Sequence, residues 1–201
     1  MRHTLRMTQN EGGDRWAELL VRRVGLAIKK ARGNKSARWL SDGTAALGYR
    51  VSPTVIAKLD SGHRGSVLSV AELLVLAAAL DIPPGLLLFP GYPYGQAEFL
   101  PGRTAHAQSA VEWFAGDGRL PAGPDGKTPR ATPPNAGTEL VSLAQRWDEA
   151  GRMFLYLEGG GQMTDAAGDR RLEERLRAQL TDLQAQIDHL SPTFEIEETP
   201  R

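Results

Sequence analysis

Apolar residues recur at steps of three and four along residues 14–90, and this spacing predicts a series of short helices. Helices are expected over 14–32, 36–47, 52–61, 69–80 and 84–89, with glycine or proline between them. The positions expected to pack inward are Trp16, Leu19, Leu20, Val24, Ala27, Ile28, Trp39, Leu40, Leu47, Leu73, Leu74, Leu76, Ala77 and Leu80. The pattern therefore predicts an all-α unit of five helices over residues 14–90.

The third segment, SPTVIAKLDSG, carries a signal at each end. Ser52 can cap the first turn, Pro53 suits the first helical position, and Gly62 suits the stop. Val55, Ile56 and Leu59 fall on one side of the expected helix. The other side carries Thr54, Ala57, Lys58 and Ser61. A hydroxyl, a methyl and an ammonium on one free face match the groups that base edges present in a major groove.

The segment before it, SARWLSDGTAALG, is also expected to be a helix, capped by Ser36 and stopped by Gly48. A four-residue turn over 48–51 then leads to Ser52. Two helices, a tight turn begun by glycine and a second helix with a polar outward face are typical of a helix-turn-helix unit.

The run SARWLSDGTAALGYRVSPTVIAKLDSGHRGSVLSVAELLVLAAALDIPPGLLLFP resembles the Cro/C1-type (XRE) helix-turn-helix domain of actinobacterial regulators and phage repressors. The resemblance implies a lambda-repressor-like five-helix bundle over 14–90 that binds double-stranded operator DNA. By the same resemblance, the base-reading positions are Ser52, Pro53, Thr54, Ala57 and Lys58. The expected phosphate contacts are Ser36, Arg50, Ser61, His63 and Arg64.

The remaining segments differ in composition. Residues 1–13 are polar and include Gly12-Gly13, so a loose arm is expected. Residues 91–115 combine an extended stretch with a short aromatic-ended helix, a mixed extension expected to pack on the bundle. Residues 116–137 are dense in proline and glycine and predict a linker. Helices are expected again within 138–190, and residues 191–201 form an acidic tail.

The last predicted helix carries a seam of apolar residues at steps of 4, 3, 4 and 3. This is a heptad pattern a little over two repeats long, formed by Leu176, Leu180, Leu183, Ile187 and Leu190. Two interpretations remain open. In the first, the two C-terminal helices bury each other as an antiparallel hairpin; in the second, the seam dimerises the protein as a short coiled coil.

The charge is unevenly distributed, although the 201 residues carry a formal net charge of zero. Residues 14–90 hold 11 Lys and Arg against 6 Asp and Glu, whereas residues 91–201 hold 11 against 17. A basic N-terminal unit suits a phosphate-facing role.

Several kinds of chemistry lack their residues. The chain has no cysteine, which excludes disulfides and thiolate ligands or nucleophiles. The four histidines, His3, His63, His106 and His189, are scattered, and Gly126-Lys127-Thr128 lacks the earlier glycine of a P-loop. A self-cleaving peptidase domain does not fit in the helical residues after Ala136-Gly137. We therefore expect no enzyme activity, no cofactor and no metal.

No apolar run approaches 18 residues and no secretory leader is apparent, so a cytoplasmic protein without a membrane span is expected. The leading hypothesis is a DNA-binding transcriptional regulator that acts as a homodimeric repressor. The alternative is an antitoxin or adaptor whose C-terminal helices bind a protein partner. A small-molecule inducer near Trp113-Phe114 has no polar constellation to support it.

Overall fold

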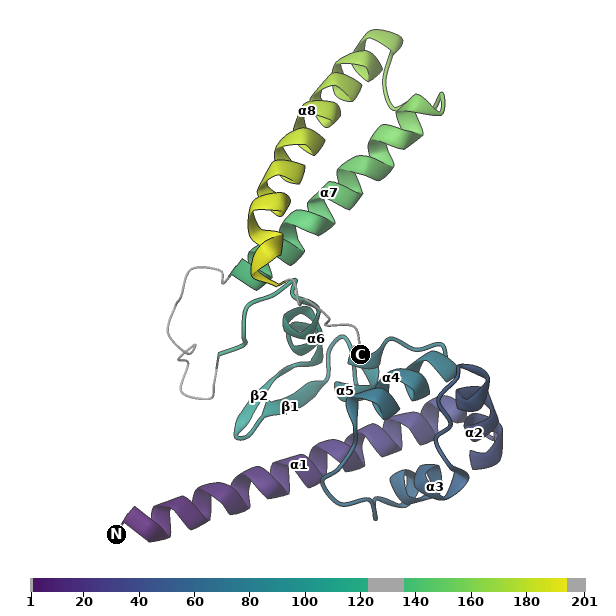
Figure 1. Cartoon of the computed structure of the whole chain (residues 1–201), viewed down its shortest axis with the longest axis vertical. Coiled ribbons are helices and arrows are strands. Elements are labelled where there is room, and N and C mark those ends of the chain that lie inside the picture. Colours follow the sequence, from purple (N-terminus) through teal and green to yellow (C-terminus); the bar gives the residue numbers. More distant parts are fainter. Residues whose placement is uncertain (1, 123–135, 195–201) are drawn as a thin grey trace, which may run out of the picture. The chain divides into compact units, whose positions relative to one another are not determined.

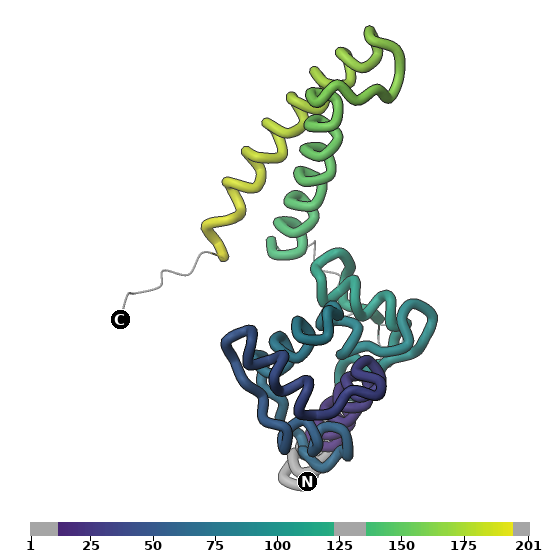
Figure 2. The backbone as a smooth tube through the Cα atoms, turned by 90° about the vertical axis from the view of Figure 1, so that its right-hand side faces the viewer, coloured from purple at the N-terminus to yellow at the C-terminus, as the bar shows by residue number. Residues whose placement is uncertain are grey.

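The computed structural model describes the backbone of residues 2–122 and 136–194, with side chains from residue 12 onward. Helices dominate these residues, together with one small sheet of two strands. The chain divides into two compact units (Figures 1 and 2). Unit 1 contains residues 1–115 and unit 2 contains the C-terminal helices. The all-α class expected from the sequence is thus correct at the coarse level, with a β-hairpin added.

Five helices build the first part of unit 1: α1 (Arg2–Arg32), α2 (Ala37–Ala46), α3 (Pro53–Ser61), α4 (Val70–Ala79) and α5 (Pro84–Leu88). Their inward faces share one core that includes Val24, Ile28, Leu40, Ile56 and Leu76, each fully buried. Ser69 and Glu72 form a reciprocal capping box at the start of α4. Apart from the start of α1, the helices therefore begin and end close to the positions that the sequence signals predict.

The N-terminal segment differs from its prediction. Residues expected to form a loose arm continue α1, which begins at Arg2 and passes through Gly12 and Gly13. Asp14 consequently lies inside this helix and is not its cap. Each glycine costs about 1 kcal/mol in a helix, and that cost weakens a helix without ending it.

Four residues assigned to the core from helical spacing are exposed. Leu19, Trp39, Leu47 and Leu74 each leave between 45 and 54% of their surface accessible. Helical spacing alone predicted their burial wrongly, because the face that each helix buries is narrower than the face that its apolar residues occupy. The Trp39 ring of α2 is not buried in the core. The Lys35 ammonium, just before α2, lies 5.6 Å from the centre of this ring.

Residues 96–115 form an antiparallel hairpin followed by a helix. Strands β1 (Gln96–Leu100) and β2 (Arg103–His106) pair, and α6 (Ala107–Ala115) follows directly. Phe89, Phe99 and Ala107 anchor a second core cluster. The Phe89 and Phe114 rings meet edge to face at 6.3 Å, and the Arg23 guanidinium donates to the Glu98 carbonyl oxygen at 3.0 Å. Both contacts join this extension to the five-helix part of unit 1.

Unit 2 is an antiparallel helical hairpin of α7 (Ala136–Glu158) and α8 (Ala166–Leu190), followed by a 3-10 turn, η1 (Ser191–Thr193) (Figure 1). Asp165 caps α8 through its side chain. Leu176 and Leu183 of the predicted seam are buried, and Leu176 packs with Ala150 and Leu157 of α7. The most buried seam residues are thus used inside one chain, as in the hairpin interpretation.

Two of the predicted segments fall largely outside the described residues. These are the linker, of which residues 123–135 lie outside, and the acidic tail, of which residues 195–201 lie outside.

Candidate nucleic-acid interface

Helix α3 has the boundaries that its sequence predicts. The Ser52 hydroxyl accepts a hydrogen bond from the Val55 amide at 3.3 Å, and Pro53 occupies the first turn. Gly62 closes the helix in the left-handed conformation, with φ of 72°. The amides of Gly62 and His63 then donate to the carbonyl oxygens of Leu59 and Lys58. Both ends are therefore satisfied locally, as expected for a helix that stands partly free of the core.

The two sides of α3 have opposite environments. Ile56 and Leu59 are 0 and 1% exposed and belong to the bundle core. The residues predicted to read bases are all exposed, namely Ser52, Pro53, Thr54, Ala57 and Lys58. Ser61 is exposed as well, and its hydroxyl donates to the Lys58 carbonyl oxygen at 3.2 Å. The structure thus exposes the face of α3 that carries these residues, while the opposite face of the helix packs in the bundle core.

Helix α3 is fixed to α1 by an ion pair and by a close backbone approach. The Arg32 guanidinium binds both oxygens of Asp60, at 2.7 and 3.2 Å, and both side chains are largely buried. Gly25 faces Leu59 so closely that a β-carbon there would lie 2.8 Å from the Leu59 carbonyl carbon. Arg32 is therefore a structural residue, not one of the free basic residues of α1.

The turn between α2 and α3 is held by two buried polar residues that the sequence analysis did not single out. The Thr44 hydroxyl donates to the Ser41 carbonyl oxygen at 2.8 Å and accepts from the Val51 amide at 3.0 Å. Gly48 has φ of 89°, a value that favours glycine. A hydroxyl on the inner side of a helix leaves no periodic signal, so only the tertiary fold identifies Thr44.

Four of the five predicted phosphate contacts are accessible, among them Ser36 and Arg50. Ser36 caps α2 by accepting from the Trp39 amide, and it remains exposed. Arg50 lies two residues before the Ser52 cap and is about half exposed. Its guanidinium binds Asp42 at 2.9 Å and the Ser41 hydroxyl at 3.3 Å. Because an exposed ion pair of this kind contributes little, the Arg50 guanidinium remains available to a phosphate.

The placement of Arg64 argues against its predicted phosphate role. Its guanidinium binds both oxygens of Glu72, at 2.5 and 2.7 Å, and donates to the Val67 carbonyl oxygen at 3.0 Å. The Arg64 side chain is only 16% exposed. In this structure Arg64 orders the turn after α3 and ties it to α4, and its phosphate contact stays a prediction. His63, the neighbouring predicted contact, is exposed.

Several exposed basic side chains lie in or beside α1 and α2, before α3 in the sequence. Arg22, Lys29, Lys30, Lys35 and Arg38 are exposed, and the Arg22 side chain lies beside Gly62 at the end of α3. Burial lowers the pKa of Arg23, an effect that Glu98 opposes. A guanidinium remains charged at neutral pH despite such a shift. Of these cations, Arg22 lies at the C-terminal end of α3.

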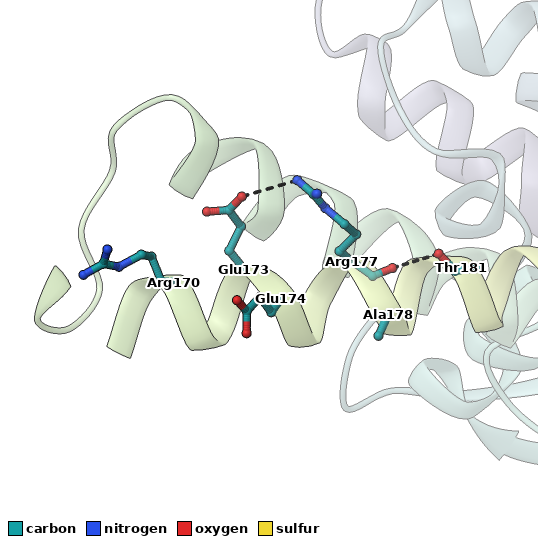
Figure 3. A pocket seen from close by; sticks show the side chains of 6 residues that line it. All are labelled: Arg170, Glu173, Glu174, Arg177, Ala178 and Thr181. Atoms are coloured by element: carbon teal, nitrogen blue, oxygen red, sulfur yellow. Dashed lines mark hydrogen bonds and ion pairs between the residues drawn. The ribbon is translucent and has the colours of Figure 1, made fainter. Parts of the chain in front are cut away.

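A depression also lies on the surface of α8. It is lined by Arg170, Glu173, Glu174, Arg177, Ala178 and Thr181, all from one helix (Figure 3). Glu173 binds Arg177 at 3.5 Å, and the Thr181 hydroxyl donates to the Arg177 carbonyl oxygen at 3.0 Å. Both bonds join residues one helical turn apart, as is common on any charged helix surface. The depression therefore offers no convergent chemistry.

No metal or membrane site is found in the described part of the chain. Within residues 12–122 and 136–194, whose side chains are described, no three His, Asp or Glu side chains are grouped so that they could hold a metal ion. Over the same residues, no helix combines the length and apolar character needed to cross a bilayer.

Comparison with known proteins identifies no relative: no family model, no curated protein and no solved structure matches this chain.

Proposed function

We propose that the protein is a sequence-specific DNA-binding transcriptional regulator of the XRE type, acting as a repressor by occupying its operator. The observation that carries the proposal is the two-sided environment of α3. Its outward residues Thr54, Ala57 and Lys58 are exposed, while Ile56 and Leu59 fix the opposite side in the core. A capped helix of nine residues presented in this way suits insertion into a major groove.

Each exposed residue of α3 has a role in this mechanism. Lys58 donates to the N7 and O6 acceptors of guanine, Thr54 donates to or accepts from a base edge, and Ala57 contacts a thymine methyl. Pro53 has no N–H and contributes only shape. Ser36 and Arg50 hold the phosphate backbone and position α3, since backbone contacts fix register without reading sequence.

Two proteins bound to half-sites one helical turn apart fit a palindromic operator. The ion pair of Arg32 with Asp60 and the hydroxyl of Thr44 keep α3 rigid on its scaffold. A recognition helix fixed in this way loses little conformational freedom on binding, which favours specific over nonspecific affinity.

The test measures fluorescence-anisotropy binding to DNA from upstream of the protein's own gene and to a scrambled sequence, between about 50 and 200 mM salt. We expect a clear preference for the upstream DNA. Lys58→Ala should weaken that specific binding by about 1–3 kcal/mol and leave binding to scrambled DNA nearly unchanged. Equal loss on both DNAs would refute base reading by Lys58.

Arg175→Ala serves as the control, because it removes one exposed positive charge from α8 and not from α3. It should leave both affinities unchanged.

A further inference from the structure

Helix α7 carries a second apolar stripe in addition to the one that packs on α8. Leu143, Ala150 and Leu157 are buried in the hairpin. A separate set follows at steps of 4, 3, 4 and 4 on the neighbouring face, formed by Leu140, Ala144, Trp147, Gly151 and Leu155. Within this set, Trp147 is 40% and Leu155 is 65% exposed, and Ala144 is exposed as well.

The described core of unit 2 is small for a hairpin of two helices of 23 and 25 residues. Five apolar residues are buried in it, Leu143, Ala150, Leu157, Leu176 and Leu183. Helices in water owe most of their stability to tertiary packing of an apolar face, and two-helix units rarely supply enough of it alone. Bundles of four helices supply it by pairing two such hairpins.

The stripe alternates large and small residues, which makes it complementary to its own antiparallel copy. Trp147 and Leu155 project, whereas Ala144 and Gly151 leave space. Leu180 of α8 lies next to Gly151: a β-carbon on Gly151 would be 3.9 Å from a Leu180 methyl. When two copies of α7 pair about a two-fold axis near residue 149, Trp147 faces Gly151 and Leu155 faces Ala144 of the other copy.

The charges beside the stripe fit the same arrangement. Asp148 and Arg152 lie on one edge of α7, bound to each other at 3.1 Å and exposed to solvent. The two-fold axis that aligns Trp147 with Gly151 also brings Asp148 of each copy toward Arg152 of the other. The edge is therefore complementary in charge to its own antiparallel copy.

We propose that the occupant of this α7 stripe is a second copy of the chain, and that the two hairpins form an antiparallel four-helix bundle. The interface is centred on Trp147, a residue type enriched at the energetic centres of interfaces. The predicted seam on α8 is not the interface, because Leu176 and Leu183 are already buried within each chain.

Sedimentation equilibrium of the full chain tests the interface without any DNA. We expect a dimer that Ala144→Glu and Leu155→Glu each weaken by at least about tenfold in Kd, since each places an unpaired carboxylate between the helices. The matched control is Gln145→Glu, which adds one negative charge at the exposed neighbour of Ala144 but off the stripe. Gln145→Glu should remain dimeric. At protein concentrations well above the weakened Kd, all three variants should keep the helical circular dichroism of the parent.

Disulfide trapping tests the orientation, because the chain contains no cysteine of its own. In the antiparallel dimer, a mixture of Ala144→Cys and Leu155→Cys cross-links, while each variant alone does not. The reason is that the same residue of the two copies is displaced by eleven residues along the paired helices, about 16 Å. A disulfide needs α-carbons within roughly 7 Å.

A monomeric parent at about 100 µM, a concentration at which a Kd in the micromolar range would give a dimer, would overturn the proposal. So would a dimer that Ala144→Glu leaves intact, or homodisulfides at either position. None of these outcomes bears on DNA binding by α3, so the two proposals fail separately.

Discussion

Arg32, in the last turn of α1, and Asp60, in the last turn of α3, are joined by two hydrogen bonds of 2.7 and 3.2 Å. Their side chains are only 8 and 16% exposed. The Arg32 guanidinium also donates to the Lys35 carbonyl oxygen at 2.8 Å, where the chain leaves α1. One side chain therefore fixes both the start of the α1–α2 connection and the end of the candidate recognition helix.

Arg32→Ala is expected to lower the free energy of unfolding by about 1–3 kcal/mol, because it leaves the Asp60 carboxylate without its partner. Urea unfolding measures the loss. In a double-mutant cycle with Asp60→Ala, the two losses should be strongly non-additive. Additive losses would show that the pair contributes nothing as a pair.

Gly25→Ala is expected to destabilise unit 1 by about 1–3 kcal/mol, because the new methyl meets the Leu59 backbone of α3. Gly43→Ala on α2 is the matched control, since its methyl would meet only Ala79 at an ordinary 3.6 Å. It should stabilise the helix by up to about 1 kcal/mol. Thermal unfolding of both variants gives the comparison, and equal effects would contradict a close approach at Gly25.

Thr44→Val removes the hydroxyl that joins α2 to the turn but keeps the side-chain shape. The Val51 amide is then left buried without an acceptor, at an expected cost of about 1–3 kcal/mol. Thr54→Val makes the same chemical change on the exposed face of α3 and should alter stability by less than about 0.5 kcal/mol. Similar losses in chemical denaturation of the two variants would argue against a structural hydroxyl at Thr44.

The sequence predicted those features of α3 that depend on local chemistry. Ser52, Pro53 and Gly62 act within a few residues of their own position, so their types indicate the helix ends directly. The exposed face of Thr54 and Lys58 followed from the helical period once those ends were known.

Features that depend on tertiary contacts were not predictable. Arg64 carries the same charge whether it faces a phosphate or Glu72, and only the fold brings Glu72 to it. Gly25 lies inside a helix, where a glycine does not indicate a turn. The close approach of the Leu59 backbone nevertheless requires a glycine at this position. The exposed Trp39 and Leu74 show the same limit, since an apolar period indicates a helix but not the width of the buried stripe.

Asp169, in the first turn of α8, accepts three hydrogen bonds on one oxygen from the connection before the helix. The Thr164 hydroxyl and amide donate at 2.8 Å each, and the Met163 amide donates at 3.3 Å. These bonds, with the Thr164 hydroxyl as the largest cause, lower the pKa of Asp169 from its usual 3.8. Their contribution to stability is therefore present above about pH 4 and is lost as the pH falls through the lowered pKa.

Thr164→Val should raise the pKa of Asp169 toward 3.8, because it removes the largest of these causes. Titration of the Asp169 carboxyl carbon by NMR measures the change. Thr181→Val removes a hydroxyl within α8, one that donates to the Arg177 carbonyl oxygen, and should leave the pKa of Asp169 unchanged. A pKa of Asp169 that is the same in the parent and in Thr164→Val would contradict the assignment.

Arg50 and Arg64 should differ in the salt dependence of DNA binding, although the resemblance assigned phosphate contacts to both. Each phosphate contact contributes about 0.9 to the slope of log K against log salt concentration. Arg50→Ala should lower that slope by about this amount, since Arg50 is half exposed and only weakly held by Asp42. Arg64→Ala should leave the slope unchanged and instead lower the free energy of unfolding by about 1–3 kcal/mol, because Glu72 loses its partner.

The two variants must be compared on scrambled DNA at a temperature where both remain folded, so that lost stability is not mistaken for lost affinity. An equal change of slope in both would show that Arg64 leaves Glu72 when DNA binds. An unchanged slope in both would place the phosphate contacts elsewhere, with the exposed cations of α1, Lys29 and Lys30, as the next residues to substitute.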